Sequence, residues 1–164
     1  MEEIRGWFRG RIPDEWFEGT PGVSIDREEI LVVGRLPDVE HEGGEEGRAA
    51  ARRGRITRFR EETRERRIRI AQEAERRFRR KVSWGAECGD VRELFTTLSM
   101  PVMTRLRQPE RSVLDTLVEA GVARSRSHAL AWCVRLVGQN QKEWMDDLRS
   151  ALVKVEEVRG QGPA

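Results

Sequence analysis

The sequence predicts an α+β protein that is mainly helical. Apolar residues recur at helical spacing after residue 50, strand-like runs occur at residues 30–33 and 103–108, and 37% of the residues are charged. A chain of 164 residues with this much charge has a small core for its length. The composition therefore favours an elongated or oligomeric protein over a compact enzyme.

Residues 1–38 are expected to form a small, acidic, β-rich unit. Residues 30–33, Ile-Leu-Val-Val, are a continuous apolar run that suits a buried strand. Residues 10–14 and 34–38 share the pattern Gly-Arg-apolar-Pro-Asp, in which strand-like sequence runs into a turn. Four aromatic side chains form the core of this unit or a dimer contact, or alternatively a docking surface for a protein partner. They are Trp7, Phe8, Trp16 and Phe17.

Charge is distributed unevenly along the chain. Residues 1–50 carry 6 basic and 13 acidic side chains, whereas residues 51–81 carry 14 basic and 5 acidic ones. The glycine-rich residues 39–50 are expected to be a flexible linker. Residues 51–82 are expected to form one long basic helix, because helix-forming residues dominate there and no proline interrupts them. Such asymmetry indicates contact with nucleic acid or charge pairing within the chain.

The basic helix has two interpretations. It is either a solvated helix packed through one narrow seam, or an auxiliary arm that follows phosphates and adds salt-sensitive affinity for DNA. In the second case its contacts are Arg66, Arg67, Arg76, Arg77, Arg80 and Lys81. The acidic N-terminal unit is either a soluble partner-binding or dimer-packing module, or a segment that folds back on this helix and competes with phosphate.

Residues 83–101 are expected to connect this helix to residues 102–138, where the functional signal is strongest. Alternating residues 103–108 predict a short strand, and Pro109 suits the first position of a helix. Gly121 is a plausible end for that helix. Ser125 and Ser127 are candidate N-caps of a second helix.

The runs TRLR, LDTLVEAG and SRS in this segment resemble the ribbon-helix-helix family of DNA-binding proteins, the Arc/MetJ/CopG type. The resemblance covers about 36 residues. It implies an obligate homodimer whose two strands pair into an antiparallel ribbon that enters the major groove of double-stranded DNA.

The resemblance also implies roles for individual residues. Those that face the bases are Met103, Arg105 and Arg107. Those that bind phosphate around the start of the second helix are Arg124, Ser125, Arg126 and Ser127. Those that form the dimer core are Leu106, Leu114, Leu117, Leu130 and Val134. The alternative for Arg105 and Arg107 is that they are solvated charges on the edge of an ordinary hairpin.

Residues 139–159 predict an amphipathic helix that packs on the core or on its twin in the dimer, followed by a frayed tail, residues 160–164. Trp144, Leu148, Leu152 and Val155 lie on one face of this helix.

Several classes of function have no sequence support. The chain has no phosphate-binding loop, dinucleotide-binding glycine pattern or nucleophile motif, so enzymatic chemistry and a cofactor are not expected. Cys88 and Cys133 lack metal-ligand spacing and are interpreted as buried thiols in a reducing cytoplasm. No apolar run approaches membrane-spanning length. We expect a cytoplasmic, nucleoid-associated protein.

The predicted function is that of a homodimeric, sequence-reading DNA-binding protein, such as a transcriptional regulator. One alternative is an antitoxin-like or other protein-interaction module that uses the same dimer core. Another is an architectural protein that coats DNA with little sequence preference through residues 51–81.

Overall fold

The computed structural model describes residues 1–40 and 44–161 of this α+β chain. The chain divides into two compact units, Met1–Pro101 and Val102–Ala164, which we call unit 1 and unit 2. Each unit is described by itself below.

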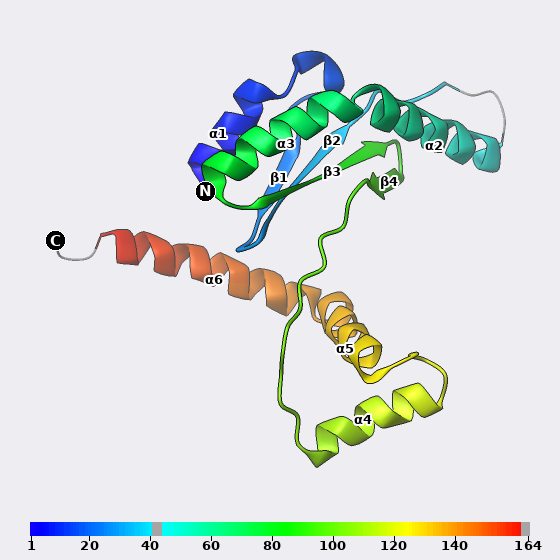
Figure 1. The fold of residues 1–164 in the computed structure, drawn as a ribbon, viewed down its shortest axis with the longest axis vertical. Coiled ribbons are helices and arrows are strands. Elements are labelled where there is room, and N and C mark those ends of the chain that lie inside the picture. Colours follow the sequence, from blue (N-terminus) through cyan, green and yellow to red (C-terminus); the bar gives the residue numbers. More distant parts are fainter. Residues whose placement is uncertain (41–43, 162–164) are drawn as a thin grey trace. The chain divides into compact units, whose positions relative to one another are not determined.

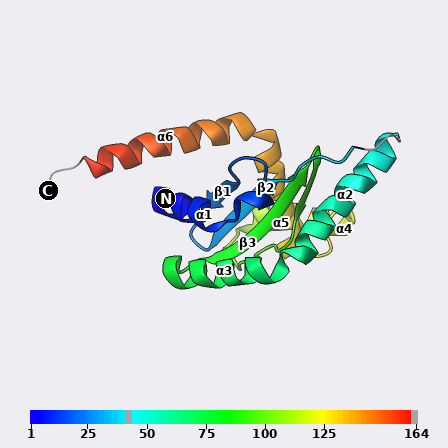
Figure 2. The ribbon, with the colours of Figure 1, turned by 90° about the horizontal axis from the view of Figure 1, so that it is seen from above.

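Unit 1 contains a four-stranded sheet in the order β1-β2-β3-β4. The strands are β1 Gly22–Ile25, β2 Glu29–Arg35, β3 Lys81–Cys88 and β4 Val91–Leu94. The β1–β2 and β3–β4 pairs are antiparallel hairpins, whereas β2 and β3 are parallel, with Ile30 opposite Val82. A parallel pair needs a long crossover, which here consists of two helices, α2 Glu45–Glu62 and α3 Arg64–Phe78. These helices follow one another along the sheet (Figure 2).

The core of unit 1 lies between one face of the sheet and three helices (Figure 1). The first helix, α1 Glu2–Arg11, contributes Ile4 and Phe8, and a short 3-10 turn, Asp14–Trp16, follows it. Ile30 and Val32 of β2 are fully buried under the helices, whereas the alternating Leu31 and Val33 are only half-buried. Helices therefore cover one face of this sheet and leave the other face more open.

The aromatic side chains near the N-terminus belong to this core. Phe8, Trp16 and Phe17 are buried, and Trp7 is half-buried against Phe8 and Phe78. For Phe8, Trp16 and Phe17 the interpretation as core is confirmed, and their alternative use as a docking surface is wrong because the chain itself covers them.

The two Gly-Arg-apolar-Pro-Asp segments adopt different structures, and the prediction that both are strand ends was wrong for the first. Residues 10–14 end α1, whereas residues 34–38 end β2. Gly34 has a specific packing reason, because a Cβ atom there would lie 2.2 Å from the ring of Phe17. The N-terminal part of the chain is therefore a helix and a hairpin, not a β-rich unit of its own.

The prediction of one long helix over residues 51–82 was wrong. The helix begins earlier, at Glu45, and breaks at Thr63, whose hydroxyl donates to the carbonyl of Phe59 at 2.6 Å. Thr63 is buried, so this back-bonding side chain bends the chain where α2 passes over the end of the sheet. Lys81 lies in β3, after Arg79 closes α3 in a left-handed conformation with φ of 56°.

Residues 83–101 are not a simple connector, because they contain most of β3 and all of β4. The linker predicted at residues 39–50 holds the first turns of α2, and its residues 41–43 lie outside the described residues. Gly85 lies within β3, although glycine is more typical of turns than of strands. A Cβ atom there would meet Leu94 at 2.8 Å and the carbonyl of Glu93 at 2.9 Å.

Unit 2 consists of three consecutive helices, α4 Gln108–Glu119, α5 Arg126–Asn140 and α6 Lys142–Gly160. The helices lie close to where the sequence predicted them, and Pro109 lies in the first turn of α4. The predicted strand at residues 103–108 is absent from this single chain: residues 101–107 have no regular secondary structure, and Gln108 is helical. A lone strand has no partner for its backbone groups, so a ribbon between two copies stays a prediction.

The core of unit 2 is small. Only three of its described apolar residues are buried, Leu114, Ala123 and Ala129. The predicted dimer-core residues Leu106, Leu117 and Leu130 are half-buried against this cluster, whereas Val134 is 66% exposed. Unit 2 thus leaves much of its apolar surface uncovered.

Candidate nucleic-acid interface

The turn between α4 and α5 positions the predicted phosphate-binding residues. Gly121 has a φ of +73°, a conformation that glycine adopts without strain, and it ends the turn that follows α4. Ser125 caps α5, because its hydroxyl oxygen accepts a hydrogen bond from the amide of His128 at 3.2 Å. The imidazole Nδ1 of His128 accepts from the amide of Arg124 at 3.3 Å. These two bonds fix the backbone where α5 begins.

The four predicted phosphate-binding residues are brought together at the N-terminus of α5, and all are exposed. Free amides and the positive end of the helix dipole favour an anion at such a position. Ser127 is in the first turn and takes no part in the cap, so only one of the two candidate N-caps is used. The arrangement can bind a phosphate through hydrogen bonds that amides, a hydroxyl and guanidinium groups donate to its oxygens.

Arg126 is engaged within the unit. Its Nε and Nη2 donate to the two carboxylate oxygens of Asp115 at 2.6 and 2.7 Å. The hydrogen bond from Arg126 lowers the pKa of Asp115, and Asp115 in turn raises the pKa of Arg126. This exposed bidentate pair joins α4 to α5 and orients one face of the guanidinium toward solvent. Sequence analysis did not foresee the pair, although the two charges are opposite and lie on adjacent predicted helices.

The segment before α4 has its side chains on two sides. Leu106 is half-buried against the small core of unit 2, whereas Met103 is 97% exposed and Arg105 and Arg107 are exposed. Arg111 donates to the carbonyl of Leu106 at 2.7 Å, which ties the segment to the first turn of α4. The apolar side chain therefore points inward and the three predicted base-reading residues are free to contact another molecule.

The basic residues of α3 and the start of β3 are largely occupied within unit 1. Arg66 pairs with Glu15 at 3.0 Å and Arg77 with Glu3 at 2.9 Å. Three further contacts link the same region to its surroundings: Arg80 Nε to the carbonyl of Asp26, Lys81 to Glu75 and Arg11 to Glu73. The charge asymmetry between the N-terminal residues and this region is thus resolved in part by ion pairs inside one unit. Among the six residues predicted as phosphate contacts of the basic helix, Arg76 alone has no polar partner within the described chain.

Arg67, also predicted to bind phosphate, is buried. Its Nε donates to the hydroxyl of Thr63 at 2.9 Å and its Nη2 to the carbonyl of Arg60 at 2.6 Å. Its guanidinium also lies 4.8 Å from the ring centroid of Phe95, a cation–π contact. Burial, together with the charges of Arg60 and Arg64, lowers the pKa of Arg67 to about 10, which leaves it charged at neutral pH. Arg67 holds the α2–α3 break in place and cannot reach a phosphate, so its predicted role was wrong.

A second polar cluster, which sequence analysis missed, centres on Arg52 of α2. Arg52 binds both carboxylate oxygens of Asp38 at 2.8 and 2.6 Å and one oxygen of Asp90 at 2.6 Å. The guanidinium lies against Gly89, whose φ of +57° favours glycine over a larger residue in this turn. The partners are 14 and 38 residues away in sequence, so no local pattern could have revealed them. The cluster joins α2 to the segments that follow β2 and β3, which leave the sheet at the same edge, and it is structural.

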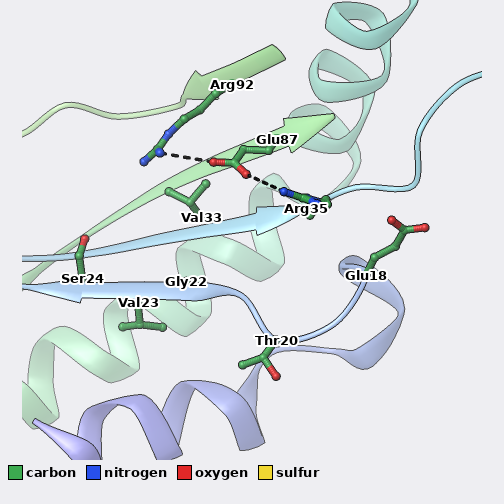
Figure 3. A pocket seen from close by; sticks show the side chains of 9 residues that line it. All are labelled: Glu18, Thr20, Gly22, Val23, Ser24, Val33, Arg35, Glu87 and Arg92. Atoms are coloured by element: carbon green, nitrogen blue, oxygen red, sulfur yellow. Dashed lines mark ion pairs between the residues drawn. The ribbon is translucent and has the colours of Figure 1, made fainter. Parts of the chain in front are cut away.

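Unit 1 also has an open pocket of about 560 Å³ beside β1 and β2 (Figure 3). Glu87 of β3 pairs with Arg92 at 3.3 Å and with Arg35 at 3.9 Å across it. One carboxylate thus engages both arginines. Among the described residues the single buried side-chain polar atom without a partner is Nε1 of Trp84, which does not line this pocket.

Comparison with known proteins follows the division into units. The family described as the Rv1265-like protein, N-terminal domain, matches residues 2–94, more than half of the chain. The chain belongs to this family. The family described as the Mb1296 C-terminal domain matches residues 107–159, which covers the three helices of the Rv1265-like chain's unit 2.

Close relatives share both parts of this Rv1265-like chain. It is 59% identical over 157 residues to the uncharacterized protein Mb1296 of Mycobacterium bovis and to the uncharacterized protein Rv1265 of Mycobacterium tuberculosis. The match covers 96% of this chain and 69% of each relative. No solved structure matches the chain.

Two further properties bear on the kinds of site that are present. Within residues 1–40 and 44–161, no group of three or more acidic, histidine or cysteine side chains is arranged to hold a metal ion. None of the helices described in this structure combines the length and the apolar character that crossing a lipid bilayer requires.

Proposed function

We propose that the chain is a homodimeric DNA-binding protein that acts as a transcriptional regulator. Residues 103–107 of two copies pair as an antiparallel ribbon, which enters the major groove. The observation that carries the proposal is the two-sided segment before α4: Leu106 packs on the helices, while Met103, Arg105 and Arg107 are exposed.

When two such segments pair, one side of the ribbon contributes to the core and the other side faces the DNA. Leu106 of each copy closes a joint apolar core with Leu117 and Leu130, which are half-buried in one chain. The opposite side then presents four arginines, two from each copy, to the base edges. An arginine donates to O6 and N7 of guanine at once, and each such contact is worth about 1–3 kcal/mol of discrimination.

The N-terminus of α5 supplies the complementary contact. The capped and exposed turn with Arg124, Ser125 and Ser127 supports the binding of a backbone phosphate, which positions the ribbon but does not read sequence. The pair between Asp115 and Arg126 keeps α4 and α5 at a fixed spacing, so that both contacts can form on one duplex.

The ion pairs of α3 favour sequence reading over unspecific coating of DNA. An architectural protein would need the basic side chains of residues 51–81 free for phosphates, and Arg66, Arg77 and Lys81 are already engaged by acidic side chains of the same unit. Their contribution to DNA affinity should accordingly be small.

A genomic DNA pull-down with sequencing tests the proposal first. A regulator enriches one motif, whereas an architectural protein gives even coverage, and a chain that captures no DNA but retains a protein would support the interaction-module alternative. On the enriched motif, Arg105→Ala and Arg107→Ala are each expected to lose about 1–3 kcal/mol of binding free energy and to relax the sequence preference.

Arg135→Ala provides the matched control, because Arg135 is an exposed arginine of α5 in the same unit. It should leave the motif and the affinity for it nearly unchanged. Equal losses in all three variants, with the preferred motif intact, would show that the ribbon residues add general charge only, and would contradict the proposed base reading.

A further inference from the structure

Helix α6 carries an apolar seam that its own unit leaves uncovered. Trp144, Leu148, Ala151, Val155 and Val158 are separated by four, three, four and three residues. Trp144 is 56% exposed, Leu148 42% and Val155 44%. A repeat that averages 3.5 residues is the spacing at which two helices supercoil around each other. Most of the stability of a helix in a protein comes from packing of its apolar face, and the stripe of this 19-residue helix is not packed within its own unit.

The opposite face of α6 carries charged side chains that pair with one another. Lys142 and Arg149 both pair with Asp146, at 2.6 and 2.7 Å, along the helix. Asp146 lies two residues from both Trp144 and Leu148 and therefore about 200° around the helix from each of them. The apolar seam and the ion-paired face are thus on opposite sides, as in a helix that binds a partner through one side.

We propose that α6 pairs with α6 of a second copy of this chain as an antiparallel two-stranded coiled coil. In this arrangement Trp144 of one copy lies beside Val155 of the other, and Leu148 lies beside Ala151. Large side chains then face small ones in every central layer, which fills the interface evenly. A parallel pair would instead set Trp144 against Trp144 and leave Ala151 against Ala151.

The charges that flank the seam also select the antiparallel pair. Asp147 and Lys154 lie on the same flank, and neither takes part in an ion pair within the part of the chain that the structure describes. When the helices are antiparallel, Asp147 of each copy lies beside Lys154 of the other, so that two ion pairs form by symmetry. A parallel pair would bring Lys154 beside Arg159 of the second copy, two like charges.

The second flank is apolar and widens the same contact. Met145 and Leu152 lie there. In the antiparallel pair, Met145 of each copy lies beside Leu152 of the other. Val153, which is also exposed, lies outside the seam. The contact uses none of the residues proposed for the DNA-binding ribbon. The pairing of α6 and the DNA-binding function can therefore be tested independently of each other.

Charge reversal in the full-length chain tests the pairing. The variants Asp147→Lys and Lys154→Asp are each expected to weaken self-association about tenfold, because each sets like charges together twice. The double variant, and an equimolar mixture of the two single variants, restore opposite charges and should regain association. Sedimentation equilibrium measures each constant, and capture of one single variant by an affinity-tagged form of the other measures the mixed pair.

Arg149→Asp is the matched control, because it makes the same change of charge as Lys154→Asp on the ion-paired face, away from the seam. It should leave association unchanged. If copies associate only through the ribbon, all of these variants behave alike, which would overturn the proposal. If Lys154→Asp strengthens association instead, the helices are parallel and the antiparallel arrangement is wrong. Recovery in the mixture requires folded chains, so loss of folding cannot imitate the expected pattern.

Discussion

Units 1 and 2 differ in how they cover apolar surface. Among the described residues, unit 1 buries 17 hydrophobic side chains and leaves 4 large ones exposed, whereas unit 2 buries 3 and leaves 13 exposed. The cause is the sheet, which gives the helices of unit 1 a broad surface on which to pack.

The sheet brings together residues that are far apart in sequence. Ile30 and Val82 are opposite one another in adjacent strands, and they share one core cluster with Phe8, Phe59 and Trp84. The helices of unit 2 pack mainly on their neighbours in sequence, and in this arrangement they leave much of their apolar stripes exposed. Unit 1 therefore buries its apolar surface within one chain, whereas unit 2 leaves apolar surface exposed, which we propose a second copy covers.

The largest expected effect is on the core of unit 1. Phe8 is fully buried and makes edge-on contacts with Trp7 and Trp84. Phe8→Ala is expected to lower the free energy of unfolding of unit 1 by about 3–5 kcal/mol, through lost burial and the cavity left behind. Urea titration, followed through amide resonances of β2 and β3, measures this change in the free energy of unfolding. Ile68→Ala, at a side chain 42% exposed in α3, is the control and should change little.

A core substitution in unit 2 is expected to have a smaller effect and to depend on protein concentration. Leu114→Ala removes the largest buried side chain of the small cluster and should lower stability by about 2–3 kcal/mol. Because we expect a second copy to cover the same helices, the loss should grow on dilution. Val113→Ala, at the adjacent and 55% exposed position, is the comparison. Equal effects of the two substitutions at high dilution would mean that unit 2 has no core of its own.

The sequence revealed most where local pattern decides structure. The strand at residues 30–33 and the helices of unit 2 follow from apolar spacing, proline and capping residues, and they lie near the predicted positions. The α+β class followed from the same signals.

Elements that depend on distant contacts were missed. Helix α1 contains Gly6 and Gly10, which disfavour a helix, and it is held by burial of Ile4 and Phe8 against the sheet. Strand β3 was missed because Gly85 resembles a turn residue until Leu94 is packed over it. The Asp115–Arg126 pair in the candidate interface likewise depends on how α4 and α5 meet.

The smallest expected effect concerns the electrostatic cluster at Arg52. Hydrogen bonds from Arg52, and then from the amide of Val39, hold the pKa of Asp38 well below its ordinary value. A carboxyl group with a lowered pKa in the folded state stabilises the fold above its unfolded pKa, near about 4, and loses that contribution as the pH falls. Unit 1 should therefore lose stability below about pH 4, and Arg52→Met should be less stable at neutral pH and lose less on acidification. Urea midpoints measured between neutral pH and about pH 3 test this, and an unchanged pH dependence in the variant would assign it to other carboxylates.

Hydrogen exchange of residues 103–107 tests the proposed completion of unit 2 most directly. If two copies pair these segments as a ribbon, alternate amides are protected in the dimer, and their protection disappears on dilution together with the dimer. Pairing through α6 alone would leave these amides unprotected at every concentration. Rapid exchange of residues 103–107 in a chain that sedimentation shows to be dimeric would contradict the ribbon and the base-reading role of Arg105 and Arg107.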